Sequence, residues 1–268
     1  MIRENRYNLE IEPLSSFGDS GFKLLISITI LLHLFGCSGC SNREESHFTI
    51  LQPDAIDKLE VKEPSDLCFG STTDILYTVS DNTAQIYKLN TRGQILETLK
   101  YTGSDLEGVV QVNNQFIYAV EERLRDVEQL DLQGNHVAHF KIAVENRDDN
   151  AGLEGIAYNS VNKCFYLLNE QNPGLLIIAD EQFNILKEKR LEFADDYSGI
   201  CIDEISQELW IVSDLSATVN RCNLYGDPIE QFRIPVSNPE GIAVDIRKHK
   251  LYVVSDREAR LYSFTINN

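Results

Sequence analysis

The sequence predicts an all-β protein: a β-propeller of five four-stranded blades, with the last blade closed by an N-terminal strand. Two short motifs recur in one shared register, and short β-rich runs with turn residues fill the intervals between them. The last repeat lacks a fourth strand, and a matching strand occurs near the N-terminus. Closing a ring of blades in this way removes the exposed edges that an open sheet would leave.

The first motif is an acid or a serine followed by glycine, at the start of an apolar strand. Its copies are Glu107-Gly108-Val109, Glu154-Gly155-Ile156, Ser198-Gly199-Ile200 and Glu240-Gly241-Ile242, with a degenerate copy at Ser65-Asp66-Leu67. The copies recur every 42 to 47 residues. That spacing fits one blade of four short strands.

The second motif begins 11 or 12 residues after the first and runs from an aromatic residue to an acid. Its copies are Tyr77-Thr-Val-Ser-Asp81, Tyr118-Ala-Val-Glu-Glu122, Tyr166-Leu-Leu-Asn-Glu170, Trp210-Ile-Val-Ser-Asp214 and Tyr252-Val-Val-Ser-Asp256. Because two independent motifs keep one register, the repeat is a strong signal.

Each repeat contains four short strands, named a to d in chain order. In the last repeat, strands a, b and c are expected at residues 241–245, 251–255 and 260–264. Strand d is missing there, and residues 55–61 match the strand d pattern of the preceding repeat. We therefore expect residues 55–268 to form the propeller, with the strand at 55–61 completing the last blade.

The N-terminal region is typical of an export signal and not of a folded element. Residues 24–36 are mostly apolar, but they are too few for a helix that crosses a bilayer, which needs about 20 residues. Leu34-Phe35-Gly36-Cys37 resembles a bacterial lipobox, in which the cysteine is lipidated and becomes the new N-terminus. We therefore expect a lipoprotein signal peptide at 1–36, an acylated Cys37 and a polar tether at 37–54.

These features predict an exported protein of the bacterial cell envelope, lipid-anchored at the outer membrane or the periplasmic face. The chain carries 42 Asp and Glu against 24 Lys and Arg, a formal net charge of −18. We therefore exclude nucleic acid as a partner, because phosphate binding needs a basic surface. Adhesion to anionic lipid through basic charge is excluded on the same ground, so the lipid anchor is the expected link to the membrane.

The chain has six cysteines, and we expect buried thiols in place of a disulfide framework. Cys37 belongs to the lipobox and Cys40 to the tether. Cys68 and Cys201 align with small or apolar residues of strand a, and Cys222 aligns with leucines of strand c. Free cysteine behaves as a small apolar residue in such positions.

Many of the acids should converge on one end of the propeller. Strand a lines the central channel of such a fold, and the loops before strand a and after strand b lie at the same face. Eight carboxylates are thereby directed to one mouth of the channel: Glu107, Glu154, Glu240, Asp81, Glu122, Glu170, Asp214 and Asp256. The acidic loops at 147–150 and 194–196 lie at the same face and could help to hold a cation.

Carboxylates held together raise one another's pKa unless protons, arginines or a cation neutralise them. A flexible ring of hard oxygen ligands suits Ca²⁺ best. Glu is a poor β-former and an unusual residue for an innermost strand, so the motif glutamates point to a functional role. The expected metal ligands are Glu107, Glu154, Glu240, Glu122 and Glu170.

Two other roles compete with metal binding. An aspartate after a strand often caps the next turn by bonding to its own backbone, and we expect this of Asp81, Asp214 and Asp256. Three arginines lie close in sequence to the acids and could pair with them: Arg123, Arg125 and Arg257.

The repeated Glu-Gly-[Ile/Val] and aromatic-x-Val-Ser-Asp/Glu patterns, together with the N-terminal membrane segment, resemble the SdiA-regulated family of bacterial envelope proteins, distantly related to NHL-repeat propellers. The resemblance covers about residues 55–268 and implies a five-bladed propeller associated with calcium. It places the calcium-linked site at Glu107, Glu154 and Glu240. Ser198 and Ser65-Asp66 depart from the motif, so we expect a lopsided cation site and not a complete acidic ring.

Two functions fit these features. The first is a membrane-tethered binding or scaffold module with Ca²⁺ at the channel mouth, which would take a small-molecule or protein ligand at its acidic face. The alternative is a calcium-dependent hydrolase, lactonase-like or phosphoesterase-like, in which a carboxylate serves as the base near the ion. We favour the binding module, because the enzyme propellers that this alternative resembles have six blades and this sequence predicts five.

Overall fold

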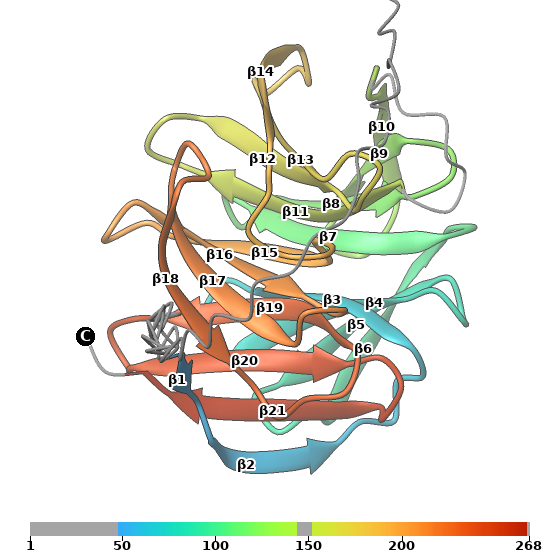
Figure 1. Ribbon diagram of the computed structural model, residues 1–268. Helices are drawn as coiled ribbons and strands as arrows, with labels where there is room; N and C mark the ends of the chain where they lie inside the picture. The colour runs from blue at the N-terminus through green and yellow to red at the C-terminus, as the bar shows by residue number, and fades with distance from the viewer. Residues whose placement is uncertain (1–47, 144–151, 267–268) are drawn as a thin grey trace, which may run out of the picture. The chain divides into compact units, whose positions relative to one another are not determined.

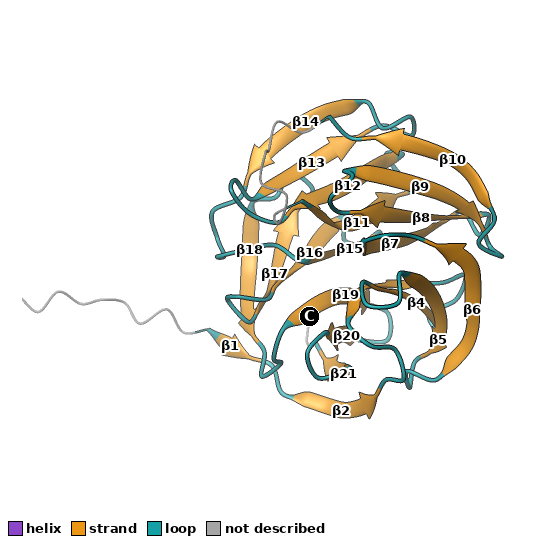
Figure 2. Ribbon diagram, turned by 90° about the vertical axis from the view of Figure 1, so that its right-hand side faces the viewer, coloured by secondary structure: helices purple, strands orange, loops and turns teal. Residues whose placement is uncertain are grey.

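The computed structural model describes residues 48–143 and 152–266, which fold into five β-sheets around a central channel (Figure 1). Figure 2 shows only strands and loops in this part of the chain. The described residues therefore include no helix that is long and apolar enough to cross a membrane. The predicted all-β propeller of five blades is confirmed.

Each blade has four antiparallel strands, and its first strand lies against the channel. Blade 1 is β3 (Pro64–Phe69), β4 (Ile75–Ser80), β5 (Gln85–Asn90) and β6 (Ile95–Thr102); blade 2 is β7 (Leu106–Val112), β8 (Phe116–Glu121), β9 (Asp126–Asp131) and β10 (His136–Lys141). Blade 3 is β11 (Leu153–Asn159), β12 (Cys164–Asn169), β13 (Leu175–Ala179) and β14 (Ile185–Arg190); blade 4 is β15 (Gly199–Asp203), β16 (Glu208–Ser213), β17 (Thr218–Asn223) and β18 (Pro228–Arg233).

Blade 5 combines the two ends of the propeller sequence. Its strands are β19 (Pro239–Asp245), β20 (Lys250–Ser255), β21 (Arg260–Thr265) and the N-terminal β2 (Pro53–Lys58). Strand β2 runs antiparallel to β21, with Lys58 opposite Arg260 (Figure 1). The predicted closure by an N-terminal strand is confirmed.

A further short strand, β1 (Thr49–Ile50), adds to blade 4 and was not foreseen from the sequence. It runs parallel to the outer strand β18, and the Leu51 N–H donates to the Arg233 carbonyl at 2.9 Å. The Arg233 guanidinium also lies over the Phe48 ring, 4.5 Å from its centroid. These contacts join the end of the expected tether segment to the outside of a blade.

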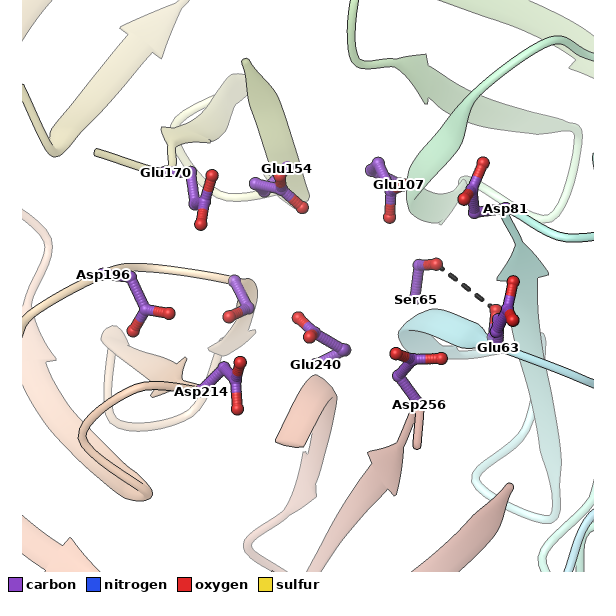
Figure 3. Close-up of a pocket in the computed structure, with 11 residues that line it drawn as sticks. Glu63, Ser65, Asp81, Glu107, Glu154, Glu170, Asp196, Asp214, Glu240 and Asp256 are labelled. Carbon is purple, nitrogen blue, oxygen red and sulfur yellow. Dashed lines mark hydrogen bonds between the residues drawn. The ribbon is translucent and has the colours of Figure 1, made fainter. Parts of the chain in front are cut away.

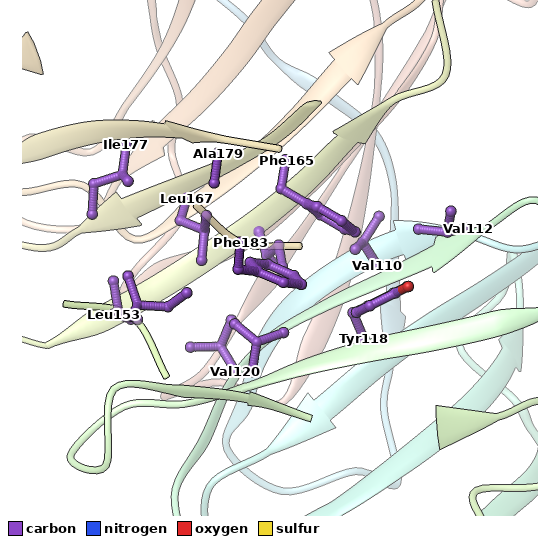
Figure 4. Packing of buried hydrophobic residues seen from close by; sticks show 13 residues of the cluster. Val110, Val112, Tyr118, Val120, Leu153, Phe165, Leu167, Ile177, Ala179 and Phe183 are labelled. Carbon is purple, nitrogen blue, oxygen red and sulfur yellow. The ribbon is translucent and has the colours of Figure 1, made fainter. Parts of the chain in front are cut away.

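The hydrophobic core consists of five clusters, one between each pair of neighbouring blades, including blades 5 and 1. The aromatic residues that open the second motif pack into these interfaces. Between blades 2 and 3, Tyr118 contacts Phe165 with ring centroids 4.8 Å apart (Figure 4). Burial of this apolar surface between blades is the main force that holds the ring together.

The turn between strands c and d shows how one blade adapts the repeat. In three blades this turn holds a glycine with positive φ: Gly93, Gly134 and Gly226. In blade 3 the same place is taken by Phe183, with φ of 59°. Its ring stacks on Phe165 at 4.4 Å in the core (Figure 4). Burial of this ring offsets the cost of a left-handed backbone at a residue with a side chain.

The glycine of the first motif is required by the close approach of neighbouring innermost strands. A Cβ atom at Gly108 would lie 2.3 Å from the carbonyl oxygen of Glu154 in the next blade. A Cβ at Gly199 would lie 2.2 Å from the carbonyl oxygen of Glu240. The motif therefore combines a first residue that faces one end of the channel with a glycine that lets the neighbouring innermost strands approach closely.

The cysteines of the propeller are free thiols, as the sequence predicts. Cys68 and Cys222 are buried, whereas Cys164 and Cys201 are only partly buried, which the repeat alignment does not predict. Cys37 and Cys40 lie outside the described residues, as do the expected signal peptide and most of the expected tether.

Candidate functional site

The beginnings of the five innermost strands surround a cavity of about 300 Å³ at one mouth of the channel. Figure 3 shows its lining of nine carboxylate side chains and two serines. They are Glu63, Ser65, Asp81, Glu107, Glu154, Glu170, Asp196, Ser198, Asp214, Glu240 and Asp256. No lysine or arginine of the described chain lines this cavity, which we call the acidic mouth.

A β-bulge places each motif glutamate in the acidic mouth. In β7, Leu106 pairs with Glu121 and Gly108 pairs with Val120, so Glu107 is the extra residue between them. Strands β11 and β19 have the same irregularity at Glu154-Gly155 and Glu240-Gly241. A bulge leaves one residue outside the ladder and redirects its side chain. This explains how a glutamate fits on an innermost strand.

Four of the five acids that follow the b strands line the acidic mouth, and Glu122 does not. The predicted capping role for the three aspartates is wrong. The turn is capped by the preceding serine: Thr83 N–H donates to Ser80 Oγ, Ser216 N–H to Ser213 Oγ and Glu258 N–H to Ser255 Oγ, each at 3.2 Å. Because the serine satisfies the turn, the carboxylates of Asp81, Asp214 and Asp256 are left to line the cavity.

A third repeated position contributes to the site, two residues before the first motif. It holds Glu63, Asp105, Gly152, Asp196 and Asn238. Its backbone carbonyl accepts the N–H of the acid after strand b: Glu122 N–H donates to Asp105 at 3.0 Å, Glu170 N–H to Gly152 at 3.1 Å and Asp256 N–H to Asn238 at 3.1 Å. The shared register is the signal that could have identified Glu63 and Asp105 as site residues.

Two groups of three carboxylates bring one oxygen from each residue within 4.8 Å of the others. The first group is Glu122, Glu154 and Glu170, and the second is Asp81, Asp105 and Glu107. Four of the five expected ligands therefore lie in these groups. Glu240 lines the same cavity but belongs to neither group.

Glu154 is the least satisfied member of the first group. Glu122 accepts a hydrogen bond from Gly152 N–H at 2.9 Å, and Glu170 accepts one from the Gln171 side chain at 2.9 Å. The Glu154 carboxylate is only 9% exposed and accepts no hydrogen bond from the described residues. A buried carboxylate without a partner is costly, so this group favours a ligand that supplies positive charge.

Burial and mutual repulsion change the protonation of the whole site. Burial raises the pKa of Glu154 well above its usual range, and the charges of Glu107 and Glu240 add to the effect. Burial likewise raises the pKa of Glu107 and of Glu240, and raises the pKa of Glu170 to about 7. Without a counter-charge, several of these groups hold protons near neutral pH.

Arginines neutralise little of this charge. Arg123 Nε lies 3.3 Å from Asp105 Oδ2, at the edge of the second group, and its side chain is largely exposed. Arg125 donates to the Asn169 side chain at 3.3 Å, and Arg257 forms no ion pair within residues 48–143 and 152–266. The expected pairing with arginine is thus found at Asp105 alone.

Solved structures share the fold. The glutaminyl cyclase of Myxococcus xanthus matches with a TM-score of 0.64 and 9% identity, over 80% of this chain and 97% of that one. Two weaker matches are a virginiamycin B lyase from Staphylococcus aureus (TM-score 0.47, 17% identity, 75% of this chain and 69% of that one) and a streptogramin B lyase (TM-score 0.48, 14% identity, 80% and 74%). At this identity, the first match shows a common propeller fold.

The sequence patterns of this chain match one protein family over almost the whole propeller. The match to the SdiA-regulated family runs from residue 43 to residue 265, which spans all five blades and the closing strand. The bulged Glu-Gly motif and the acid after strand b, which carried the resemblance, are the positions that build the acidic mouth. The chain belongs to the SdiA-regulated family.

Proposed function

We propose that this protein is a binding module of the bacterial cell envelope, tethered to the membrane by a lipid, that holds Ca²⁺ at its acidic mouth. The observation that carries the proposal is Glu154, a buried carboxylate with no hydrogen bond inside a group of three close carboxylates. A cation would let Glu154, Glu122 and Glu170 ionise together, because its charge offsets their mutual repulsion.

The donor set favours calcium over softer metals. Both groups of three consist of carboxylate oxygens only, without histidine or cysteine. Ca²⁺ prefers six to eight oxygen ligands in flexible geometry, whereas Zn²⁺ and Cu²⁺ prefer nitrogen or sulfur. Glu122, Glu154 and Glu170 would hold the ion, and water or carbonyl oxygens would complete its shell.

The remaining carboxylates suggest what the module binds. Seven acids of the acidic mouth lie outside the first group, among them Glu240 and Asp214. They would accept hydrogen bonds from an ammonium, guanidinium or hydroxyl group of a small molecule or a protein loop. The proposed tether, acylated at Cys37, would keep this mouth close to the membrane surface.

The experiment that tests the calcium site is thermal unfolding of the full-length chain in chelator and in micromolar to millimolar Ca²⁺. We expect calcium to raise the melting temperature, because it binds the folded state alone. Glu154→Gln should abolish the rise, while Glu188→Gln, the same change on the exposed outer strand β14, should preserve it. A wild-type melting curve that is unchanged across this calcium range would refute the site.

A calcium-dependent hydrolase is the second candidate function. The observation in its favour is the second group, Asp81, Asp105 and Glu107. These carboxylates are additional to the three that would hold the ion. One of these could act as a general base on a water molecule. Turnover of a panel of lactones and phosphoesters that chelator abolishes would support this function, and no turnover with either class would exclude it.

A further inference from the structure

The innermost strands also enclose a second cavity, at the opposite end of the channel. It measures about 370 Å³, and all five blades line it through the C-terminal halves of β3, β7, β11, β15 and β19. We call it the far mouth. Its inner wall is one aligned position in each blade: Cys68, Val110, Ala157, Cys201 and Ala243.

Asp66 separates the far mouth from the acidic mouth. It takes the place of the motif glycine in β3 and is fully buried. Burial raises the pKa of Asp66 well above its usual range, against hydrogen bonds from the backbone. Its Oδ2 accepts the Val109 N–H of the next blade at 2.8 Å, and the Ile156 N–H of the third blade also bonds to it. Strands β3 and β15, which are not neighbours in the ring, approach within 8 Å. Because the channel is this narrow, the two cavities share no lining residue.

Most of the side chains that line the far mouth are apolar, and Glu204 is the one charged residue among the described residues that line it. Ile156, Ile200 and Val244 line it beside the five aligned residues. Burial raises the pKa of both the Cys68 and the Cys201 thiol, so neither is a thiolate at neutral pH.

A few polar groups surround this apolar wall. The Gln111 carboxamide lines the cavity and makes no side-chain hydrogen bond within the described residues. At the rim, Glu204 accepts the Ser160 N–H at 2.7 Å. No lysine, arginine or histidine of the described chain lines the far mouth. An anion would therefore meet the carboxylate of Glu204 without any compensating positive charge.

We propose that the far mouth binds a small uncharged molecule with an apolar body and one polar group that reaches Gln111. A cavity of this volume, lined mostly by apolar side chains with a few polar groups, has the usual composition of a small-molecule pocket. The site is independent of the proposed calcium site, because Asp66 closes the channel between them.

A matched pair of fluorescent probes tests the site and its preference for neutral ligands. N-phenyl-1-naphthylamine is uncharged, and 8-anilino-1-naphthalenesulfonate carries a sulfonate on the same ring system. We expect saturable binding of the neutral probe to the full-length chain, at least about tenfold tighter than the anionic probe, because the site offers no partner for a buried charge. Equal affinity for both probes would overturn the proposed preference of the far mouth for uncharged ligands.

Cysteine labelling locates the probe. Cys201 lines the far mouth, while Cys164 is also partly buried but lies outside it. The neutral probe should slow modification of Cys201 by a small methanethiosulfonate reagent by about tenfold, because the probe occupies most of the sites. The rate at Cys164 should not change. Mass spectrometry of each cysteine peptide measures both rates. Binding without protection of Cys201, or no saturable binding, would overturn the proposal.

Two variants complete the test. Cys201→Phe should fill the cavity and abolish binding of the neutral probe, whereas Glu154→Gln in the acidic mouth should leave this binding unchanged. If Cys201→Phe fails to fold, labelling of the wild-type chain still decides the outcome. Loss of probe binding in Glu154→Gln would show that the two mouths are not separate.

Discussion

At the residue scale, small departures from regular strand structure decide which side chains reach the acidic mouth. Glu107 faces the cavity because a bulge removes it from the β7 ladder, and Asp81 faces it because Ser80 caps the turn. Ser80 Oγ accepts the Thr83 N–H at 3.2 Å and donates to the Lys62 carbonyl at 2.6 Å. The two neighbouring residues thus have separate roles: Ser80 caps the turn and Asp81 lines the cavity.

This division of roles predicts opposite effects of two adjacent substitutions. Ser80→Ala should lower the free energy of unfolding by about 1–2 kcal/mol, because it leaves a buried carbonyl and a backbone N–H without a partner. Asp81→Asn should leave stability equal or higher in chelator, because burial and the charge of Asp105 already raise the pKa of this carboxyl. Urea unfolding of both variants measures the difference. A larger loss of unfolding free energy in Asp81→Asn than in Ser80→Ala would show that the aspartate caps the turn.

The sequence predicts some of these residues and misses others for a definite reason. Glu107, Glu154 and Glu240 repeat in a motif and could be placed on the channel from their register alone. The register could also have placed Asp105 at this face, but not its group with Asp81 and Glu107, which depends on side-chain distances across a bulge. Register gives the face on which a residue lies, but which carboxylates meet depends on the width of the channel.

At the scale of elements, the innermost strands are held at very short separations by the motif glycines. The backbone at Gly108 faces the Glu154 carbonyl across the boundary between blades 2 and 3. The repeat predicted the number, order and closure of the strands, since each of these follows from counting motifs. The parallel strand β1 could not be counted in this way, because it repeats nothing and pairs through only two residues.

Close backbone packing predicts a strong effect of a single added methyl group. Gly108→Ala should lower the free energy of unfolding by about 2–3 kcal/mol, because the new Cβ would meet a backbone oxygen that cannot move without shifting a strand. Gly70→Ala is the comparison: the nearest atoms to its Cβ belong to the side chains of Ile75 and Tyr77 and not to a neighbouring backbone, so a smaller loss is expected. Chemical denaturation of both variants measures the effect. Equal, small losses would show that the strands can separate easily.

At the scale of the whole molecule, the net charge of −18 is partly concentrated at one place. Nine of the 42 acids line the acidic mouth, although it occupies only one end of the channel. The five apolar interfaces between blades provide the rigid ring that holds these charges together. The far mouth, formed by the same strands, is lined mostly by apolar side chains and by a single acid, Glu204. One ring thus presents two chemically different ends.

The predicted lipid anchor concerns the position of this molecule in the cell. Mass spectrometry of the mature protein from a bacterial host should find an N-terminal Cys37 that carries acyl chains. Cys37→Ser should remove the lipid and release the chain from the membrane fraction, because a tether without acyl chains has no net basic charge to hold it to lipid: Arg43 is outnumbered by Glu44, Glu45 and Asp54. Cys40→Ser is the matched control and should remain anchored. An N-terminus that retains residues 1–36 would contradict the prediction.

The charge at the acidic mouth also predicts how stability depends on pH. Burial raises the pKa of Glu154 and Glu240 well above the unfolded range, and that of Glu170 to about 7. Between the unfolded and folded pKa values the folded state binds more protons, so the free energy of unfolding must fall as pH rises. In chelator, the melting temperature should therefore be lower at pH 8 than at pH 5.5, with the contribution of Glu170 lost by about pH 7 to 8.

Calcium should remove most of this pH dependence, because it occupies the place of the protons that Glu154 and its neighbours lose. The melting temperature in millimolar calcium should change little between pH 5.5 and 8, and the apparent calcium affinity should rise with pH, since protons and the ion compete for the same oxygens. Calorimetric scans at four pH values, with and without chelator, measure both trends. A melting temperature in chelator that rises with pH would mean that these carboxylates are ionised and already compensated in the folded chain.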